Sequence, residues 1–154
     1  MKGKIKYLIL FLVINFSGLG FGSWLMNNGP MTNWYLSLTK ASWTPPGWVF
    51  GAAWTTIMIC FSIYLMYLFT KKYTDKKLSL FIIQVIFNVS WNYIFFNQHQ
   101  VLLALIVITL LTALIFYLFF TYLKEQKKTS YLLLPYMIWL CIATSLNLYI
   151  FIHN

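Results

Sequence analysis

The sequence predicts an all-α integral membrane protein, a bundle of five transmembrane helices in a single domain, 1–154. Of the residues, 61% are apolar and 8% are charged, which leaves too few charges to solvate the surface of a water-soluble domain. Five apolar stretches provide the roughly 20 helical residues needed to cross about 30 Å of hydrocarbon. The lysines gather at every second gap between these stretches.

The lysine positions predict the orientation in the membrane. Ten of the 11 lysines lie within 2–6, 71–77 and 124–128, and only Lys40 lies elsewhere. Five crossings put those ten charges on one side, as the positive-inside bias requires. We therefore expect a cytoplasmic N-terminus and an external C-terminus. The net charge of +9 sits in short caps beside apolar runs, where lysines face anionic headgroups, so no nucleic-acid partner is expected.

The first helix is expected at about 6–27. Its lysines, apolar core and following small residues also resemble a secretory signal, whose cleavage would leave four helices. We favour an uncleaved helix, because the apolar run continues through Trp24 and Leu25. The next 17 residues, 28–44, form a long aromatic loop with a single charge. Such a loop is interpreted as a lid over the bundle or as an interfacial aromatic belt.

The second helix is expected at about 45–70, with Pro45 and Pro46 in its first turn and Ser42 or Thr44 as its cap. The third and fourth, at about 78–96 and 101–123, are separated by four polar residues, 97–100, which would be costly at the bilayer centre. The fifth is expected at about 130–153. Two glycine pairs spaced by four, Gly18 with Gly22 and Gly47 with Gly51, predict close helix packing, inside the monomer or across a dimer.

Few residues offer conventional catalysis. Asp75 and Glu125 both lie in the lysine-rich gaps, so no carboxylate is expected inside the membrane as a general base or proton relay. His99 and His153 lie at the ends of apolar runs, and no ligand pair has helical spacing. No metal site and no cofactor is therefore predicted.

Uncharged polar and aromatic residues recur at helical spacing in the third and fifth helices. The two faces comprise Gln84, Asn88, Trp91, Asn92 and Phe95, and Tyr136, Trp139, Ala143, Leu146, Asn147 and Ile150. Amides in hydrocarbon need partners, so they are expected to point into the bundle, either joining helices or meeting a ligand. Trp91 and Trp139 lie near the middle of their helices, which favours an internal cavity for a flat, apolar ligand.

These residues resemble the TspO family, the tryptophan-rich sensory proteins related to the mitochondrial translocator protein or peripheral benzodiazepine receptor. The resemblance rests on three blocks in order along the chain. They are Trp43, Pro45, Pro46, Phe50 and Trp54; Gln84, Asn88, Trp91, Asn92, Phe95 and Phe96; and Pro135, Tyr136, Trp139, Ala143, Leu146 and Asn147. The resemblance implies a bacterial-type membrane protein, commonly a homodimer, that binds porphyrins such as protoporphyrin IX.

The resemblance also implies a set of ligand-binding residues between the loop and the helix ends. They are Trp34, Tyr35, Trp43, Pro45, Phe50, Trp54, Asn88, Trp91, Asn92, Trp139, Ala143, Leu146 and Asn147. Family members bind sterols too, but no basic residue follows Tyr149 to complete the cholesterol-recognition pattern, which is weak even when intact.

Three functions are compatible with these residues. The first is binding of tetrapyrroles for transport or sensing, which needs no catalytic acid. The second, an enzymatic role, is light- and oxygen-dependent degradation of bound porphyrin, with Trp54 and Trp139 as the catalytic electron donors. The third is a stress-response sensor or assembly factor whose pocket tunes association with another membrane protein.

Overall fold

The computed structural model describes residues 2–154, so Met1 of the predicted domain lies outside it. Every regular element in this range is helical. In chain order they are α1 (Lys2–Leu25), the 3-10 turn η1 (Gly29–Met31), α2 (Asn33–Ser37), α3 (Gly47–Lys71), α4 (Asp75–Asn92), the π-helical turn η2 (Tyr93–Asn97), α5 (Val101–Gln126), the 3-10 segment η3 (Lys127–Leu133) and α6 (Leu134–His153).

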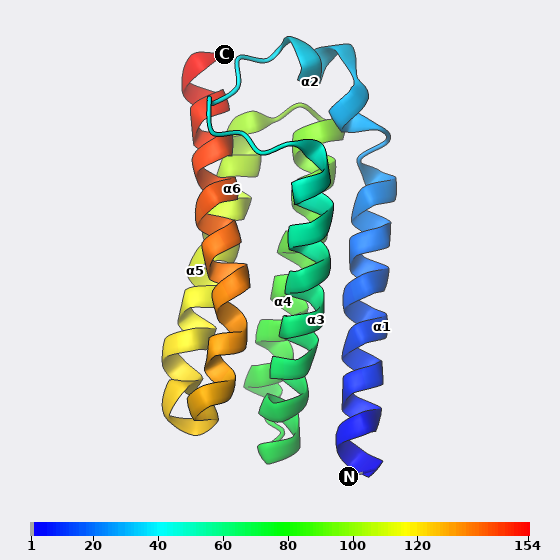
Figure 1. The fold of residues 1–154 in the computed structure, drawn as a ribbon, viewed down its shortest axis with the longest axis vertical. Helices are drawn as coiled ribbons and strands as arrows, with labels where there is room; N and C mark the ends of the chain where they lie inside the picture. The colour runs from blue at the N-terminus through cyan, green and yellow to red at the C-terminus, as the bar shows by residue number, and fades with distance from the viewer. Residues whose placement is uncertain (1) are drawn as a thin grey trace.

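Five long helices form one bundle with their axes roughly aligned (Figure 1). Four stretches are long and apolar enough to cross a membrane, namely Gly3–Met31, Gly47–Lys71, Asp75–Asn97 and Val101–His153. The last of these contains both α5 and α6, which fold back on each other through η3 (Figure 1). The predicted fold class, an all-α membrane bundle of five helices, is confirmed.

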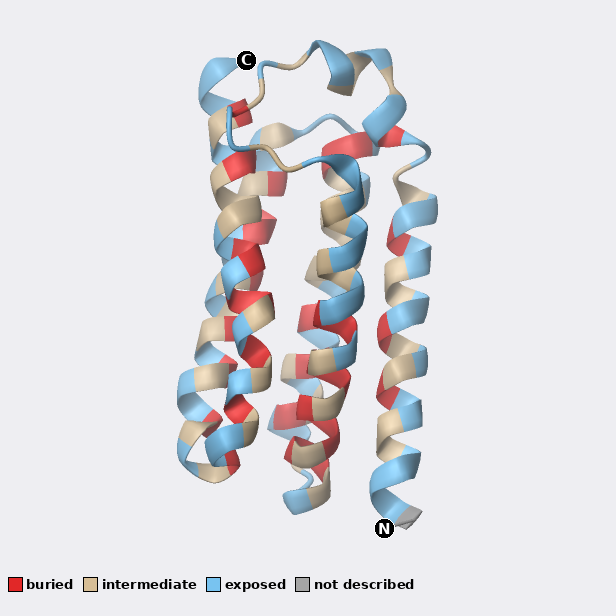
Figure 2. Cartoon of the chain, viewed as in Figure 1, coloured by how far each residue is buried: buried red, intermediate tan, exposed pale blue. Residues whose placement is uncertain are grey.

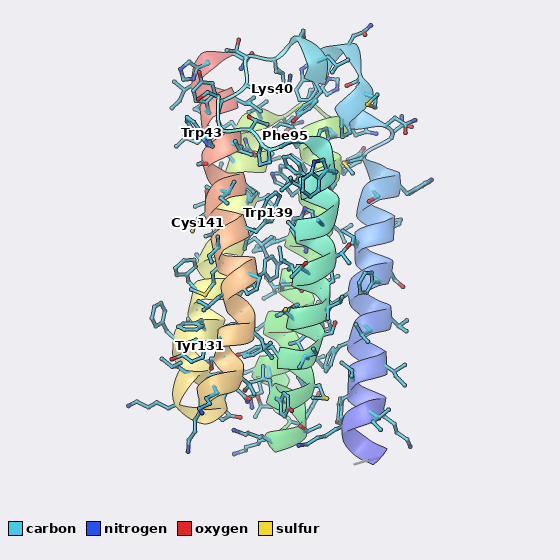
Figure 3. The ribbon with its side chains drawn as sticks, in the orientation of Figure 1. Lys40, Trp43, Phe95, Tyr131, Trp139 and Cys141 are labelled. Carbon is cyan, nitrogen blue, oxygen red and sulfur yellow. The ribbon has the colours of Figure 1, made fainter. Side chains whose placement is uncertain are left out.

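The lysine-rich gaps meet at one end of the bundle. The start of α1, the α3–α4 turn and the α5–α6 connection lie together there, and the segment between α1 and α3 lies at the opposite end with the α4–α5 turn (Figure 1). Lys40 is at that opposite end and Tyr131 is near the lysine-rich end (Figure 3). We call these the lysine-rich end and the lid end.

Helix α3 begins at Gly47 instead of Pro45. A residue before proline is restricted to extended backbone, so Pro45 cannot adopt helical geometry before Pro46, and Pro46 itself is extended with ψ 150°. The expected cap by Ser42 or Thr44 is wrong as well. The α3 N-terminus has no side-chain cap, and the Thr44 hydroxyl donates to Ala41 O at 2.7 Å.

The segment 28–44 is more ordered than the expected loop, because it contains η1 and α2. Thr32 caps α2 by accepting a hydrogen bond from the Tyr35 amide at 3.4 Å. We call this segment the lid. Helix α6 begins at Leu134, later than the expected 130, with Pro135 in its first turn, where its missing N–H costs nothing.

The core is concentrated toward the lysine-rich half of the bundle, where α3 meets α5 and α6 (Figure 2). Its fully buried members include Phe61, Tyr64, Ile115, Leu133 and Leu140. The lid-end half of α3 is less buried (Figure 2), and Gly47 and Gly51 have no atom within 4 Å of an added Cβ. Tight packing therefore ends about halfway up α3, and the aromatic residues above this level are arranged more openly.

The first glycine pair packs inside the monomer. A Cβ at Gly18 would lie 3.7 Å from Val89 Cγ2, and one at Gly22 would lie 2.8 Å from Asn92 Nδ2. Both neighbours belong to α4. Helix α1 thus approaches α4 so closely that a side chain at position 22 would displace the Asn92 amide.

Candidate functional site

The lid covers the ends of α4 and α5 through aromatic contacts. The Trp34 ring stacks on His99, with centroids 4.0 Å apart, and meets Phe95 edge-on at 5.6 Å. The Tyr35 ring lies 5.3 Å from Phe96. The π-helical turn of η2 places Phe95 and Phe96 where they are buried beneath these two lid residues. Trp34 and Tyr35 therefore cover the lid end of α4 and the α4–α5 turn.

Polar contacts hold the lid down. The Thr39 amide donates to Asn154 Oδ1 at 2.8 Å, and Asn154 Nδ2 donates back to Thr39 O at 3.1 Å. The ammonium of Lys40 lies 4.7 Å from the centre of the Tyr35 ring. Burial raises the pKa of the Tyr35 phenol above its ordinary value.

Trp43 lies apart from the other tryptophans of the predicted site. Its indole nitrogen donates to Ser145 Oγ at 3.2 Å, and its ring meets Tyr149 edge-on at 5.4 Å. The side chain is 53% exposed and runs along the lid-end half of α6 (Figure 3). Pro45 follows it, half-buried in the extended segment before α3.

A second group of rings joins α3 to α6. Phe50 meets Trp139 edge-on, with centroids 5.2 Å apart, and Trp54 meets Tyr136 in the same way at 5.9 Å. Trp139 is 6% exposed, and Figure 3 shows its ring directed toward α3. Its indole nitrogen Nε1 is buried without a hydrogen-bond partner. Phe50 and Trp54 are half-buried, so this group is less tightly enclosed than the core below it.

Polar side chains join α4 to α6 next to these rings. Gln84 Nε2 and Asn88 Nδ2 each donate to the Tyr136 hydroxyl at 2.8 Å. Trp91 Nε1 donates to Asn147 Oδ1 at 3.0 Å, and Asn147 Nδ2 donates to Val101 O at 3.1 Å. Asn88 and Asn147 thus point into the bundle and bridge helices. Since their amides contact protein groups, joining helices is a role they fulfil without a ligand.

Asn92, Ala143 and Leu146 occupy different surroundings. Asn92 Nδ2 donates to Asn88 O of its own helix at 3.1 Å and faces Gly22 of α1. Ala143 packs half-buried against the core, and Leu146 is buried. Ten of the thirteen predicted residues therefore divide among the lid, the α3–α6 rings, the α4–α6 bridges and the α1–α4 contact, and Pro45, Ala143 and Leu146 lie outside these groups.

Two residues outside the predicted site are central to it. Tyr136 accepts both amide hydrogen bonds and touches Trp54, and Gln84 is 1% exposed with its oxygen Oε1 unpartnered. Both were on the polar faces recognised from helical spacing, which was the available signal. Spacing alone could not show that the two faces meet at one hydroxyl.

Two hollows lie on the α1 side of this region. A cavity of about 10 Å³ is lined by Ile14, Asn15, Gly18, Leu19, Met58, Gln84, Val85, Asn88 and Val89. A groove of about 490 Å³ is lined by Phe21, Leu25, Val85, Ile86, Val89, Ser90 and Tyr93. Only Asn88 of the predicted ligand-binding residues borders either space. Trp54, Trp91 and Trp139 instead contact neighbouring rings directly.

Both acidic residues lie far from the aromatic groups. Asp75 begins α4, and Glu125 Oε1 pairs with Lys77 Nζ at 2.8 Å, at the lysine-rich end. Within residues 2–154, no group of three His, Cys, Asp or Glu side chains is arranged to hold a metal ion. The lid end thus offers aromatic surface, amides and an indole N–H as its binding groups.

Known proteins resemble this chain over most of its length. The TspO/MBR family pattern matches residues 10–153. Similar proteins include the tryptophan-rich protein TspO of Chlorobaculum tepidum, 31% identical over 84% of both chains, and the tryptophan-rich sensory protein of Cereibacter sphaeroides, 30% identical over 74% of this chain and 72% of its own. The human translocator protein is 31% identical over 78% of this chain and 74% of its own. The chain belongs to the TspO/MBR family.

Proposed function

We propose that this membrane protein binds porphyrins such as protoporphyrin IX, and other flat apolar ligands, between the lid and the lid-end halves of α3, α4 and α6. Binding there would serve transport or sensing. The names of the relatives, a tryptophan-rich sensory protein and a translocator protein, support a sensing or binding role. The rings of Phe50, Trp54 and Trp91 supply surfaces on which a conjugated macrocycle stacks.

The observation that carries the proposal is the unpartnered indole nitrogen of Trp139. A buried N–H without an acceptor costs about 1–3 kcal/mol, and native proteins rarely leave one unmatched. Trp139 Nε1 is buried without a partner, on a ring flanked by half-buried Phe50. A ligand carbonyl or carboxylate next to this ring would accept the hydrogen bond. Protoporphyrin IX combines such groups with a flat apolar ring.

The same ring groups supply the aromatic surface that the proposed ligand would contact, once the rings that now touch one another move apart. The α3–α6 contacts are edge-on, and Phe50 and Trp54 are half-buried, so part of each ring is accessible to a ligand. The lid above them is held by few hydrogen bonds, chiefly the reciprocal pair between Thr39 and Asn154. Lifting the lid therefore exposes the ring groups without unfolding a transmembrane helix.

The proposal includes the orientation of the bundle. The lysine-rich turns meet at one end, and only Lys40 lies at the lid end. By the positive-inside bias, the lysine-rich end would face the cytoplasm and the lid would face the opposite side. Accessibility of a cysteine introduced at Tyr131 or at Trp43 to a membrane-impermeant maleimide, in intact cells, tests this: labelling is expected only at position 43.

Binding is tested by titrating the purified protein with protoporphyrin IX in the dark and following quenching of tryptophan fluorescence. Darkness keeps binding separate from any photochemistry of the bound porphyrin. Trp139→Phe keeps an aromatic ring but removes the N–H, and we expect it to weaken binding about fivefold or more, as loss of one hydrogen bond worth about 1 kcal/mol implies.

The matched control is Trp24→Phe, since Trp24 is 72% exposed on α1 and outside the site. It should leave the affinity unchanged. Saturable binding that Trp139→Phe does not weaken beyond Trp24→Phe would refute the role of the indole nitrogen. Absence of saturable binding by the unmodified protein would refute the proposal as a whole.

A further inference from the structure

The surface between α1 and α4 carries an apolar groove that faces away from the bundle interior. Phe21 and Leu25 of α1 form one wall, and residues of α4 with Tyr93 form the other. The groove measures about 490 Å³, and its rim residues Phe21 and Ile86 are 52% and 56% exposed. In a membrane this groove is in contact with acyl chains and with any apolar molecule dissolved among them.

The small cavity on the other side of the same helix pair is lined by apolar side chains and three amides. Asn15, Gln84 and Asn88 line it, and Gln84 Oε1 is buried without a partner. Gln84 and Asn88 also donate to Tyr136, which touches Trp54. The cavity is thus adjacent to the α3–α6 rings of the proposed ligand site.

The groove and the cavity share a wall. Val85 and Val89 line both of them, so two valine side chains separate the membrane-facing groove from the cavity that Gln84 and Asn88 border. On the α1 side, Gly18 presents no side chain to this wall, and its position lies in van der Waals range of Val89. The partition between membrane and interior is therefore thinner here than across a layer of large side chains.

The α1–α4 contact also lacks polar cross-links. Among the residues that the structure describes, no side-chain hydrogen bond or ion pair joins α1 to α4. Three other neighbouring pairs are cross-linked: α1 to α3 by Asn15 and Ser62 at 2.8 Å, α5 to α6 by Thr112 and Thr144 at 3.1 Å, and α4 to α5 by Lys77 and Glu125 at 2.8 Å.

Separation of α1 from α4 therefore breaks no polar cross-link between the two helices. Apolar contacts between transmembrane helices are replaced by equally apolar lipid contacts when the helices part, whereas a broken hydrogen bond in hydrocarbon leaves unmatched polar groups. The π-helical turn η2 adjoins the groove through Tyr93, and such turns in helices mark positions where the backbone departs from regular packing.

We propose that the α1–α4 groove is a lateral access site, at which an apolar ligand dissolved in the membrane docks before passing between the helices to Asn88, Tyr136 and Trp54. This inference rests on the proposed function, because the ligand is the one bound there. It adds the route: the ligand arrives from the bilayer through the side of the bundle, and the lid need not open to admit it.

Cross-linking the two helices tests the route. In a background where Cys60 and Cys141 are replaced by Ser, Gly18→Cys with Val89→Cys places two thiols across the wall, where the Gly18 Cβ position and Val89 Cγ2 are 3.7 Å apart. Oxidation should slow the association of protoporphyrin IX at least tenfold in stopped-flow fluorescence, and a reductant should restore the rate. The reduced protein serves as its own reference for the two substitutions.

The matched control cross-links a different helix pair, between which the ligand is not expected to pass. Thr112→Cys with Thr144→Cys links α5 to α6, whose hydroxyls are 3.1 Å apart, and its oxidation should leave the association rate unchanged. If the oxidised α1–α4 protein binds as fast as its reduced form while the unmodified protein binds normally, the access site is refuted and the proposed function stands. If the unmodified protein does not bind porphyrin, both are refuted.

A second copy of the chain is the competing occupant of the groove. Ile86→Cys, at the rim and in the same background, distinguishes the two. Under the proposal, the introduced thiol reacts with an apolar maleimide in detergent or bilayers, and excess protoporphyrin IX slows the reaction. Rapid formation of a disulfide between position 86 of two copies, with no labelling of the monomer, would show that another copy covers the groove and would overturn the proposal.

Discussion

Trp91 on α4 and Asn147 on α6 are joined by a hydrogen bond of 3.0 Å from the indole nitrogen to the amide oxygen. The amide nitrogen of Asn147 in turn donates a hydrogen bond to Val101 O at the start of α5. One amide therefore links three helices at the lid end. Asn147 is 2% exposed, so water does not replace either bond when the amide is removed.

Asn147→Leu should destabilise the fold by about 1–2 kcal/mol, because it removes two hydrogen bonds of about 0.6 kcal/mol each in membrane proteins and leaves the Trp91 N–H unmatched. Thermal unfolding in detergent measures the effect. Gln100→Ala, an exposed amide in the α4–α5 turn, is the control and should change little. Equal melting temperatures for the two variants would contradict the structural role of Asn147.

Gly29→Ala should detach the lid from η2. An added Cβ would lie 2.4 Å from Phe96 Cβ and 2.6 Å from its ring atoms Cγ and Cδ1, and overpacking of this kind costs about 1–3 kcal/mol. Limited proteolysis within the lid should accelerate and the melting temperature should fall. In the control Gly20→Ala the added Cβ meets nothing within 4 Å, and the substitution should stabilise α1 slightly through helix propensity. A similar rise in melting temperature for Gly29→Ala would contradict the prediction, because it would show that Phe96 moves aside without cost.

Lys77 is the main polar anchor of the lysine-rich end. It is 3% exposed, and its ammonium donates to Leu68 O at 3.2 Å, Lys72 O at 2.9 Å and Glu125 Oε1 at 2.8 Å. Lys77→Met should cost about 1–3 kcal/mol, since three acceptors lose their donor. Lys128→Met, at an exposed position, should be neutral in the same chemical denaturation experiment, and a neutral result for both variants would refute the anchoring role.

Asn154→Ala should loosen the lid without affecting the core. It removes the reciprocal hydrogen bonds to Thr39, each worth about 0.5–1.5 kcal/mol, so amide hydrogen exchange across Thr39 and Lys40 should accelerate about 5-fold or more. Exchange in the core segment of α3 should stay the same. Asn97→Ala, exposed at the same end, is the comparison, and no difference between the two would mean that other contacts hold the lid.

The membrane character, the five-helix class and the family were all predictable from the sequence, for a local reason. Hydrophobic length and lysine placement act on each segment separately, so they need no knowledge of which helices touch. The departures have local causes as well. Pro46 delays α3 to Gly47, and Thr32 caps α2 inside what was expected to be an irregular loop, a short-range signal that was present but weak.

The site was less predictable, as Trp43 and Tyr136 illustrate. Both belong to the recognised blocks, yet Trp43 bonds to Ser145 on a 53% exposed surface, whereas Tyr136 is 1% exposed and accepts two amide hydrogen bonds. Helical periodicity assigns a residue to a face. It does not say which neighbouring helix that face meets, or at which height.

The sequence by itself determined that the chain enters the membrane, how many times it crosses and which residues share a helical face, because these follow from the free energy of transfer and from 3.6 residues per turn. Only the tertiary structure decided the pairing and register of the helices. Those set the contact of Gly22 with Asn92, the convergence of Gln84 and Asn88 on Tyr136, and the isolation of the Trp139 indole nitrogen. The physical reason is that lipid and protein interior are equally apolar, so specific close packing and hydrogen bonds select the partners, and both depend on residues far apart in the chain.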